Sequence, residues 1–343
     1  MRLLTVSTVS YLHQVSVLFT HARRVHPELK LTVLVSDCTR AIIDPIKNSL
    51  GMDVDVLCTA DLEYDFVEEM RTYYSALEYC SALKVLGSAH ILKKEESCLF
   101  LDPDMIILDK LDDAIFGLPG NIVISCHTMS PYPRDGNSPN DLELCLSGHI
   151  NGGLFFTRCG LHGNSALDWL VEKTKNQWFV APKLGMYADQ QWFSALPYFF
   201  RDDISIVSDC GVNVAYWNLH ERQLTRIKDT FKINLASGEP LRLMHFSGFS
   251  VPSNGKISKH TNRKYEPETE KIIQDMTSDY EVLLINAISK FEHLSADLEF
   301  TSKPLIQRMK IAAHRWNEPQ LVLPKIKFLS RLRRRFWGST DSN

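Results

Sequence analysis

Apolar and polar positions alternate through the first 265 residues in blocks whose lengths suit short strands and longer helices. A β-branched run at 2–8 predicts a strand, apolar residues at helical spacing predict a helix over 12–24, and 30–36 predicts a second strand. A strand, a helix and a strand in this order predict a right-handed crossover within a parallel sheet. Further strands are expected at 53–57, 98–101, 121–125, 152–157, 204–207 and 241–246, and further helices at 66–93 and 164–176.

The pattern changes after residue 265, where 267–276 and 280–294 predict helices. We therefore predict an α/β fold with a mixed, mostly parallel sheet and a helical C-terminal extension. Its parts are a catalytic domain over 1–265, the extension over 266–324 and a basic amphipathic tail over 325–343. Within the first part, Pro, Gly, Asn, Asp and Ser crowd the stretch 129–141, which predicts an irregular loop.

Composition narrows the class of protein. A chain of 343 residues with 44% hydrophobic residues can bury a large core, and a net charge of −3 gives no basic field for a nucleic-acid partner. The eight cysteines include no C-x-x-C pair, so reduced thiols are expected rather than a zinc site. The N-terminus lacks the apolar core of a signal peptide, and no run of about 18 apolar residues occurs. These features predict a cytoplasmic protein.

The tail adds a membrane hypothesis. Residues 325–337 read KIKFLSRLRRRFW, with six Lys and Arg and with apolar residues at helical spacing. This pattern is typical of an amphipathic helix on an anionic membrane surface, and a solvated tail is the alternative. We expect peripheral contact with the inner face of the cell membrane through 325–337.

Two carboxylates interrupt an apolar stretch at 97–108, SCLFLDPDMIIL. Asp102 falls where the predicted strand ends, which is where ligands bind in doubly wound sheets. If the chain is extended, Asp102 and Asp104 point to one side and form an oxygen-rich site for Mg²⁺ or Mn²⁺, which would bridge a diphosphate. A turn in which the aspartates cap backbone amides is the alternative. The proposed third ligand is His245, which ends another predicted strand in LRLMHFSGF, although a histidine there is often structural.

Several segments together resemble GT-A-fold glycosyltransferases, similar to glycosyltransferase family 8 and closer to bacterial surface-polysaccharide glycosyltransferase domains. They occur in that group's order across about residues 5–265, and they are VSYLHQVSVLFTHARRVHPELKLTVLVSD, ALEYCSALKVL, CLFLDPDMIIL, HINGGLFF, YADQQWF, GVNVAYWNLHER, LMHFSGF and ISKHTNR. The resemblance implies a GT-A fold and a metal-dependent, retaining transfer of a sugar from a nucleotide-diphosphate donor, expected to be a UDP-sugar. It implies a glycan or lipid-linked glycan acceptor in bacterial surface-polysaccharide synthesis.

The resemblance also assigns roles to particular residues. Asp102, Asp104 and His245 match the metal ligands, and Gly248 completes the H-x-x-G motif in which backbone approaches a phosphate. The family's usual phosphate-binding lysine is absent after this motif, so Lys259 and Lys84 are the expected substitutes. Asn151 in HINGG matches a residue that holds the donor sugar, although the Gly-Gly that follows departs from the usual Ala-Gly.

Asp189 and Gln190 match a pair near the anomeric carbon and are the expected catalytic residues. The structural alternative for this pair is the cap of a helix that starts near Gln191.

The remaining candidates follow from position. Thr8 and Tyr11, at the end of the first strand, and Asp37, after the second, are expected donor contacts, although Tyr11 and Asp37 have structural alternatives. An aromatic and polar group of residues is expected to bind the acceptor or, alternatively, to form a buried cluster; it comprises Tyr216, Trp217, Asn218 and His220.

The sequence also bears on three other functions. A sugar nucleotidyltransferase needs a Gly-rich loop after the first strand, and VSTVSYLHQ has no glycine. A glycoside hydrolase needs carboxylates on opposite sides of a sugar ring, which two residues so close in sequence cannot provide. A carbohydrate-binding module without catalysis remains an alternative.

Overall fold

The computed structural model describes residues 1–317, except 52, 161–163, 228–229 and 234–237. The predicted basic tail, 325–343, lies outside the described residues. The strands are β1 (Arg2–Ser7), β2 (Lys30–Val35), β3 (Asp55–Cys58), β4 (Ser97–Leu101), β5 (Met105–Ile107), β6 (Ile122–Cys126), β7 (Ile150–Arg158), β8 (Val180–Ala181), β9 (Met186–Tyr187), β10 (Ile204–Ile206), β11 (Leu224–Ile227), β12 (Thr230–Ile233) and β13 (Leu243–His245). The helices are α1 (Leu12–Val25), α2 (Ile43–Leu50), α3 (Val67–Met70), α4 (Ala76–Leu92), α5 (Asp141–Ser147), α6 (Ser165–Thr174), α7 (Ala188–Phe199), α8 (Pro267–Ile288) and α9 (Leu305–Arg315).

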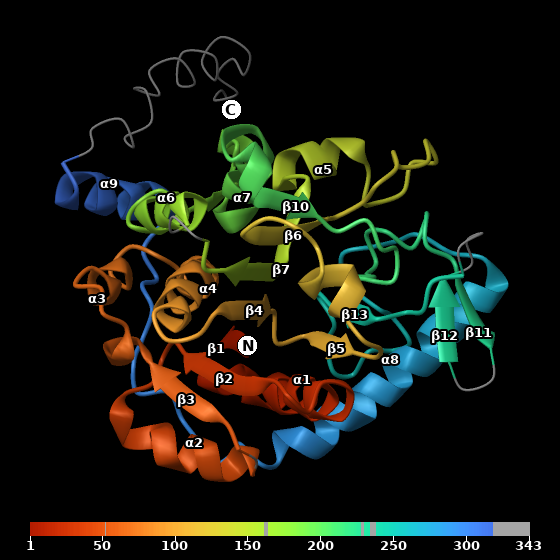
Figure 1. The fold of residues 1–343 in the computed structure, drawn as a ribbon, viewed down its shortest axis with the longest axis horizontal. Helices are drawn as coiled ribbons and strands as arrows, with labels where there is room; N and C mark the ends of the chain where they lie inside the picture. The colour runs from red at the N-terminus through yellow and green to blue at the C-terminus, as the bar shows by residue number, and fades with distance from the viewer. Residues whose placement is uncertain (52, 161–163, 228–229, 234–237, 318–343) are drawn as a thin grey trace, which may run out of the picture.

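A seven-stranded sheet in the order β10-β6-β7-β4-β1-β2-β3 forms the centre of the molecule (Figure 1). β1 pairs in parallel with both β2 and β4, β2 with β3, and β6 with β10, whereas β7 is antiparallel to its neighbours β4 and β6. The predicted α/β class, with a mixed and mostly parallel sheet and helices near the C-terminus, is therefore confirmed. The proposed division into parts at residues 265 and 324 stays a prediction.

Each strand of the sheet sends alternate side chains into two apolar layers. In β4, Leu99 packs in the layer that contains α1 and α2, whereas Cys98 and Phe100 pack in the layer that contains α4, α6 and α7. Both faces of the sheet are therefore buried, which explains why its strands read as nearly continuous apolar runs.

Two predicted helices differ from the structure. The stretch 66–93 is not one helix, because α3 ends at Met70 and α4 begins after Ser75. The side chains of Ser75 and Glu78 form a capping box that starts a new helix there. Conversely, α8 runs without a break through the gap expected near 277–279, since Thr277 and Tyr280 are buried in the helix face that packs on the protein.

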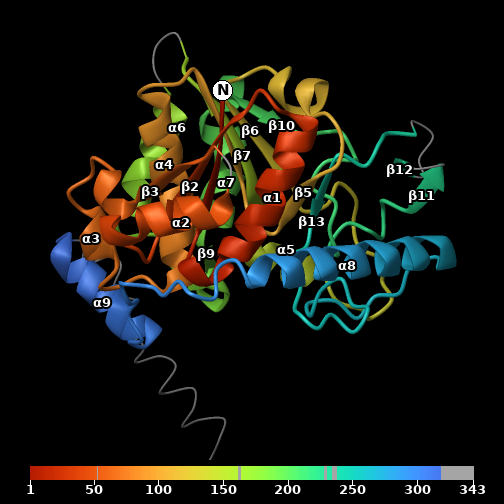
Figure 2. The ribbon, with the colours of Figure 1, turned by 90° about the horizontal axis from the view of Figure 1, so that it is seen from below.

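A small second sheet lies beside the carboxyl end of β4. The chain leaves β4, turns at 102–104 and forms β5, which pairs antiparallel with β13. Figure 2 shows α8 running along this part of the molecule, next to α1. This arrangement brings residues from 102–104 and from the end of β13 to the same place.

The helix α9 returns to the layer of α4. Arg308 is buried and ion-paired with Glu78, the same residue that caps α4, and it also donates a hydrogen bond to the carbonyl oxygen of Tyr73 at 3.0 Å. Glu78 in turn accepts a hydrogen bond from the backbone N–H of Val180 at 2.7 Å. The first turn of α4 is thus held by contacts from α9 and from β8 as well as by its own capping box. Among the described residues, no helix is long and apolar enough to cross a membrane.

Candidate active site

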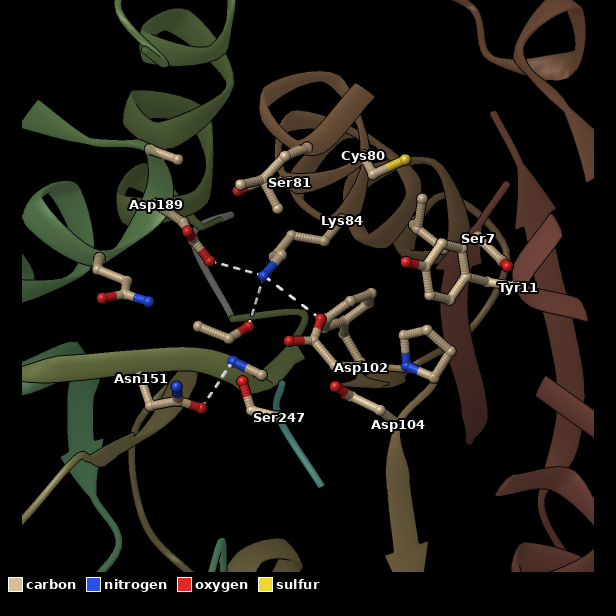
Figure 3. A pocket seen from close by; sticks show the side chains of 18 of the residues that line it. Ser7, Tyr11, Cys80, Ser81, Lys84, Asp102, Asp104, Asn151, Asp189 and Ser247 are labelled. Carbon is tan, nitrogen blue, oxygen red and sulfur yellow. Dashed lines mark hydrogen bonds and ion pairs between the residues drawn. The ribbon is translucent and has the colours of Figure 1, made fainter. Parts of the chain in front are cut away.

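A pocket of about 500 Å³ opens at the carboxyl ends of β1 and β4 (Figure 3). Its walls come from the turn after β1, one face of α4, the turn after β4, the start of β7 and the start of α7. Most of the residues predicted from the sequence line it, namely Thr8, Tyr11, Lys84, Asp102, Asp104, Asn151, Asp189, Gln190 and His245. The predicted location, beyond the carboxyl ends of parallel strands, is the one observed.

The two aspartates lie in a turn. Met105 donates its backbone N–H to the carbonyl oxygen of Asp102 at 3.2 Å, so the chain is not extended here as the sequence argument assumed. The turn nevertheless leaves both carboxylates on the pocket side, facing His245. The turn is therefore present, and it leaves the two carboxylates where they could hold a cation together with His245.

The position of His245 is set by backbone pairing. β13 pairs with β5 so that His245 lies opposite Met105, and the next residue, Phe246, donates its N–H to the carbonyl oxygen of Asp104 at 2.9 Å. As a result, Nε2 of His245 lies 3.1 Å from Oδ1 of Asp104 and 4.0 Å from Oδ2 of Asp102.

This cluster fits a divalent cation. One ligand atom from each of Asp102, Asp104 and His245 lies within 4.8 Å of the others, and the two oxygens and one nitrogen are donors that Mn²⁺ and Mg²⁺ accept. Burial and the neighbouring Asp104 raise the pKa of Asp102, although Lys84 lowers it, so the negative form is disfavoured without added positive charge. The three side chains therefore form a set of ligands that could hold a divalent cation.

Lys84, from the middle of α4, is the buried positive charge of the pocket. Its Nζ donates to Oδ2 of Asp189 at 2.6 Å and to the carbonyl oxygen of Gly152 at 2.6 Å, and it lies 3.7 Å from Oδ1 of Asp102. Burial alone would lower the pKa of Lys84, but Asp102 and Asp189 outweigh this effect and raise it, so the amine stays charged. Of the two lysines proposed for phosphate binding, Lys84 therefore lies in the pocket.

Asp189 and Gln190 belong to the first turn of α7. The helix begins at Ala188, so neither residue is its cap, and the capping alternative for this pair is wrong. Ala188 has a φ of 43°, a left-handed conformation that is unusual for alanine and is found mostly where surrounding structure enforces it. Oε1 of Gln190 is buried and makes no hydrogen bond within the described part of the chain. This oxygen can therefore accept a hydrogen bond from a ligand in the pocket.

Asn151 is followed by Gly152 and Gly153 instead of the Ala-Gly of the family that the sequence resembles, and the surroundings of Gly152 explain this difference. A Cβ atom at Gly152 would lie 1.6 Å from Oδ2 of Asp189 and 3.1 Å from Nζ of Lys84. The ion pair between Lys84 and Asp189 occupies the space that an alanine methyl group would need. The glycine and the close ion pair therefore belong together.

We expect Gly152→Ala to break this arrangement, because the clash with Asp189 can be relieved only if the carboxylate leaves Lys84. The expected result is a loss of stability of about 1–3 kcal/mol, as is typical of overpacked buried sites, together with weaker donor binding. Urea unfolding measures the first effect. Gly117→Ala is the matched control, because Gly117 has a φ of −80° and its added Cβ would meet only ordinary contacts. Equal stability of the two variants would contradict this account.

Other predicted residues lie outside the pocket lining. Asp37 accepts a hydrogen bond from the backbone N–H of Val9 at 2.8 Å, which holds the turn after β1. The backbone N–H of Lys259 donates to the carbonyl oxygen of Gly248 at 3.1 Å, next to Ser247 in the pocket wall.

The predicted acceptor group also lies outside the lining. The ring of Trp217 packs edge-on against the ring of His245, with 5.0 Å between the ring centres, so it contacts one of the three candidate metal ligands. Asn218 is fully buried and uses its amide for backbone hydrogen bonds. Tyr216 packs near Trp217, and the ring of His220 lies 4.5 Å from that of Tyr132. An acceptor role for these four residues stays a prediction.

Sequence reasoning missed part of the pocket wall. The overlooked lining includes Ser7, Gln14, Ala76, Leu77, Cys80, Ser81, Phe100 and Tyr187. One signal was present for the residues of α4, since Leu77, Cys80 and Ser81 lie one or two helical turns before Lys84 and so share its face. For the others, only the fold brings them to the site.

A curated relative is similar in sequence to this chain over most of its length. No protein-family model matches the chain. The Bacillus subtilis protein YfnF, described as uncharacterized, is 23% identical over 285 residues, which are 79% of this chain and 89% of YfnF.

Solved structures that resemble this chain include glycosyltransferases. The galactosyltransferase LgtC in complex with donor and acceptor sugar analogs is 12% identical, with a TM-score of 0.45, over 81% of this chain and 96% of that one. GlyE of Streptococcus pneumoniae is 15% identical, with a TM-score of 0.43, over 87% and 66%, and the bifunctional WbbM is 11% identical, with a TM-score of 0.44, over 84% and 51%. At these identities and TM-scores, function has to be inferred from the pocket itself.

Proposed function

We propose that this protein is a metal-dependent, retaining glycosyltransferase of the GT-A type that uses a nucleotide-diphosphate sugar, expected to be a UDP-sugar. The observation that carries the proposal is the cluster of Asp102, Asp104 and His245 in a pocket at the carboxyl ends of β1 and β4, with Lys84 beside it. Two carboxylates, a histidine and a buried ammonium group together suit a divalent cation and a diphosphate.

Each group of residues has a role in this proposal. Asp102, Asp104 and His245 hold Mn²⁺ or Mg²⁺, which when bound acts as a Lewis acid for the departing diphosphate. Thr8 and Tyr11 line the part of the pocket nearest β1, where the nucleoside is expected.

The sugar is expected to lie between Asn151 and the start of α7. Lys84 fixes the carboxylate of Asp189, and Gln190 offers the unpaired Oε1 to the sugar near its anomeric carbon. The acceptor is proposed to be a glycan or lipid-linked glycan of surface-polysaccharide synthesis, on the strength of the sequence resemblance alone.

Two alternatives make different predictions. A sugar nucleotidyltransferase would release pyrophosphate from a nucleoside triphosphate and a sugar phosphate. A carbohydrate-binding module without catalysis would bind a glycan and leave nucleotide sugars intact. The metal cluster beside the buried ammonium group of Lys84 favours the transferase over the second alternative, because a cation and an ammonium group together suit a diphosphate, which a glycan lacks.

The proposal is tested by a screen of nucleotide sugars with the purified protein, in Mn²⁺ and in EDTA, that measures release of nucleoside diphosphate. We expect at least one donor to be consumed in Mn²⁺ only, slowly by hydrolysis and faster when an acceptor is added. If no donor is consumed or bound under either condition, the transferase assignment fails.

We further propose that residues 325–337 hold the protein on anionic membranes, where a lipid-linked acceptor would be presented. The support is the basic amphipathic pattern of the sequence. Full-length protein is expected to sediment with vesicles that contain phosphatidylglycerol, and a variant that lacks 325–343 is expected not to. Equal sedimentation of both would remove the membrane hypothesis while leaving the transferase proposal intact.

A further inference from the structure

The geometry points to Asn213 as a positioning residue that orients His245 toward the cation, an inference that rests on the metal site of the proposed function. Asn213 is fully buried and does not line the pocket. Its Oδ1 lies 3.1 Å from Nδ1 of His245, on the far side of the ring from the two aspartates. The residue therefore acts on the cluster through the histidine.

The direction of each hydrogen bond follows from one backbone group. The N–H of Gly153 donates to Oδ1 of Asn151 at 3.0 Å, and a backbone amide can only donate. Oδ1 of Asn151 must then meet the amide nitrogen of Asn213, which lies 3.1 Å away. Oδ1 of Asn213 is therefore the atom that faces His245, and because it only accepts, the proton of the ring must be on Nδ1.

This tautomer leaves the Nε2 lone pair of His245 directed toward Asp104 and Asp102. A lone pair and a carboxylate oxygen 3.1 Å apart repel each other unless a proton or a metal cation lies between them. Metal-bound histidines usually donate their other ring N–H to a fixed acceptor, which holds both the tautomer and the ring. Asn213 supplies that acceptor here.

The backbone is shaped to hold Asn213 in place. Its φ is 57°, a left-handed conformation that asparagine tolerates better than most residues. The next residue, Val214, exchanges backbone hydrogen bonds with β13, where its N–H donates to Leu243 and its carbonyl oxygen accepts from His245. Asn213 and His245 are thus joined through both backbone and side chains.

Two substitutions separate the acceptor from the rest of the side chain. Asn213→Gly suits the left-handed backbone but removes the acceptor, whereas Asn213→Asp keeps an oxygen for the ring N–H and loses the amide donor to Asn151 and Ser125. Ser125→Ala is the control, because Ser125 accepts from Asn213 at 2.7 Å and is not part of the path from Gly153 to His245.

The experiment is a Mn²⁺ titration without any sugar donor, together with pulsed EPR detection of ¹⁴N coupling from a histidine ligand. We expect Asn213→Gly to bind Mn²⁺ about 10–100-fold more weakly and to lose the ¹⁴N coupling, which a purely structural role would not change. Ser125→Ala is expected to keep the coupling and near-normal affinity, and Asn213→Asp is expected to keep the coupling, because it retains an acceptor for the ring N–H.

Wild-type affinity and coupling in Asn213→Gly would overturn the inference but leave the proposed function standing. If that variant does not fold, loss of the coupling in Asn213→Asp while Ser125→Ala keeps it would overturn the acceptor role, and its retention would support it. Conversely, failure to find a sugar donor would not affect these measurements.

Discussion

Replacing Asp104 by asparagine is expected to lower Mn²⁺ affinity at least about 100-fold and sugar transfer about 1,000-fold, while the protein without metal keeps its stability. Asp104 and Asp102 are held in one turn, and the carboxylate of Asp104 lies 3.1 Å from Nε2 of His245. Removing its charge takes away a ligand for the cation. It also removes the repulsion that, in addition to burial, raises the pKa of Asp102, so the metal-free variant should unfold at the same or a higher temperature than the wild type.

Isothermal titration with Mn²⁺ and thermal unfolding in EDTA measure the two effects separately. Asp109→Asn is a suitable control, because Asp109 lies beyond β5 and outside the pocket lining. Unchanged Mn²⁺ affinity in Asp104→Asn would show that the cluster does not hold the metal. A large loss of stability in EDTA would show instead that Asp104 is needed for folding.

Replacing Lys84 by methionine is expected to cost about 3–5 kcal/mol of stability, because it leaves the carboxylate of Asp189 buried without its partner. Asp189 is 5% exposed, and Lys84 is its partner at 2.6 Å. Methionine keeps an unbranched apolar side chain but removes the ammonium group, which lies 4.9 Å from the centre of the Phe100 ring and also donates to the carbonyl oxygen of Gly152. Urea unfolding at neutral pH gives the free energy of unfolding.

A double-mutant cycle separates the charge effect from packing. Lys84→Met combined with Asp189→Asn removes both charges and should recover most of the lost stability, since the pair is in direct contact. Losses that simply add would mean that the two side chains do not stabilise each other. In that case the arrangement around Gly152 would need another explanation.

Much of the site could be predicted from the sequence because its chemistry lies at strand ends. Asp102 follows the apolar run of β4, whose carboxyl end lies beside that of the parallel strand β1. His245 ends another apolar run, although β13 reaches the site by antiparallel pairing with β5 and not as a strand of the main sheet. Lys84 lies in the stretch 66–93, which the sequence predicts to be helical, and the structure places it in α4. The fold class followed from the same runs, because strands buried on both faces are continuously apolar.

The rest depends on contacts between distant segments. Asn213 belongs to the segment GVNVAYWNLHER, but the role that we propose for it depends on β13, which brings His245 beside it. The split of 66–93 into two helices depends on the capping box of Ser75, which a long apolar pattern hides. Trp217 looks like a sugar-binding residue by composition, yet its ring packs behind His245.

The most direct test of the account is the affinity of UDP for the full-length protein, measured by calorimetry with Mn²⁺ and with EDTA. If Asp102, Asp104 and His245 hold a cation that bridges a diphosphate, Mn²⁺ should tighten UDP binding at least about 100-fold, and Asp104→Asn should abolish that gain. UDP binding of equal strength in Mn²⁺ and EDTA, or no UDP binding in either, would contradict the account.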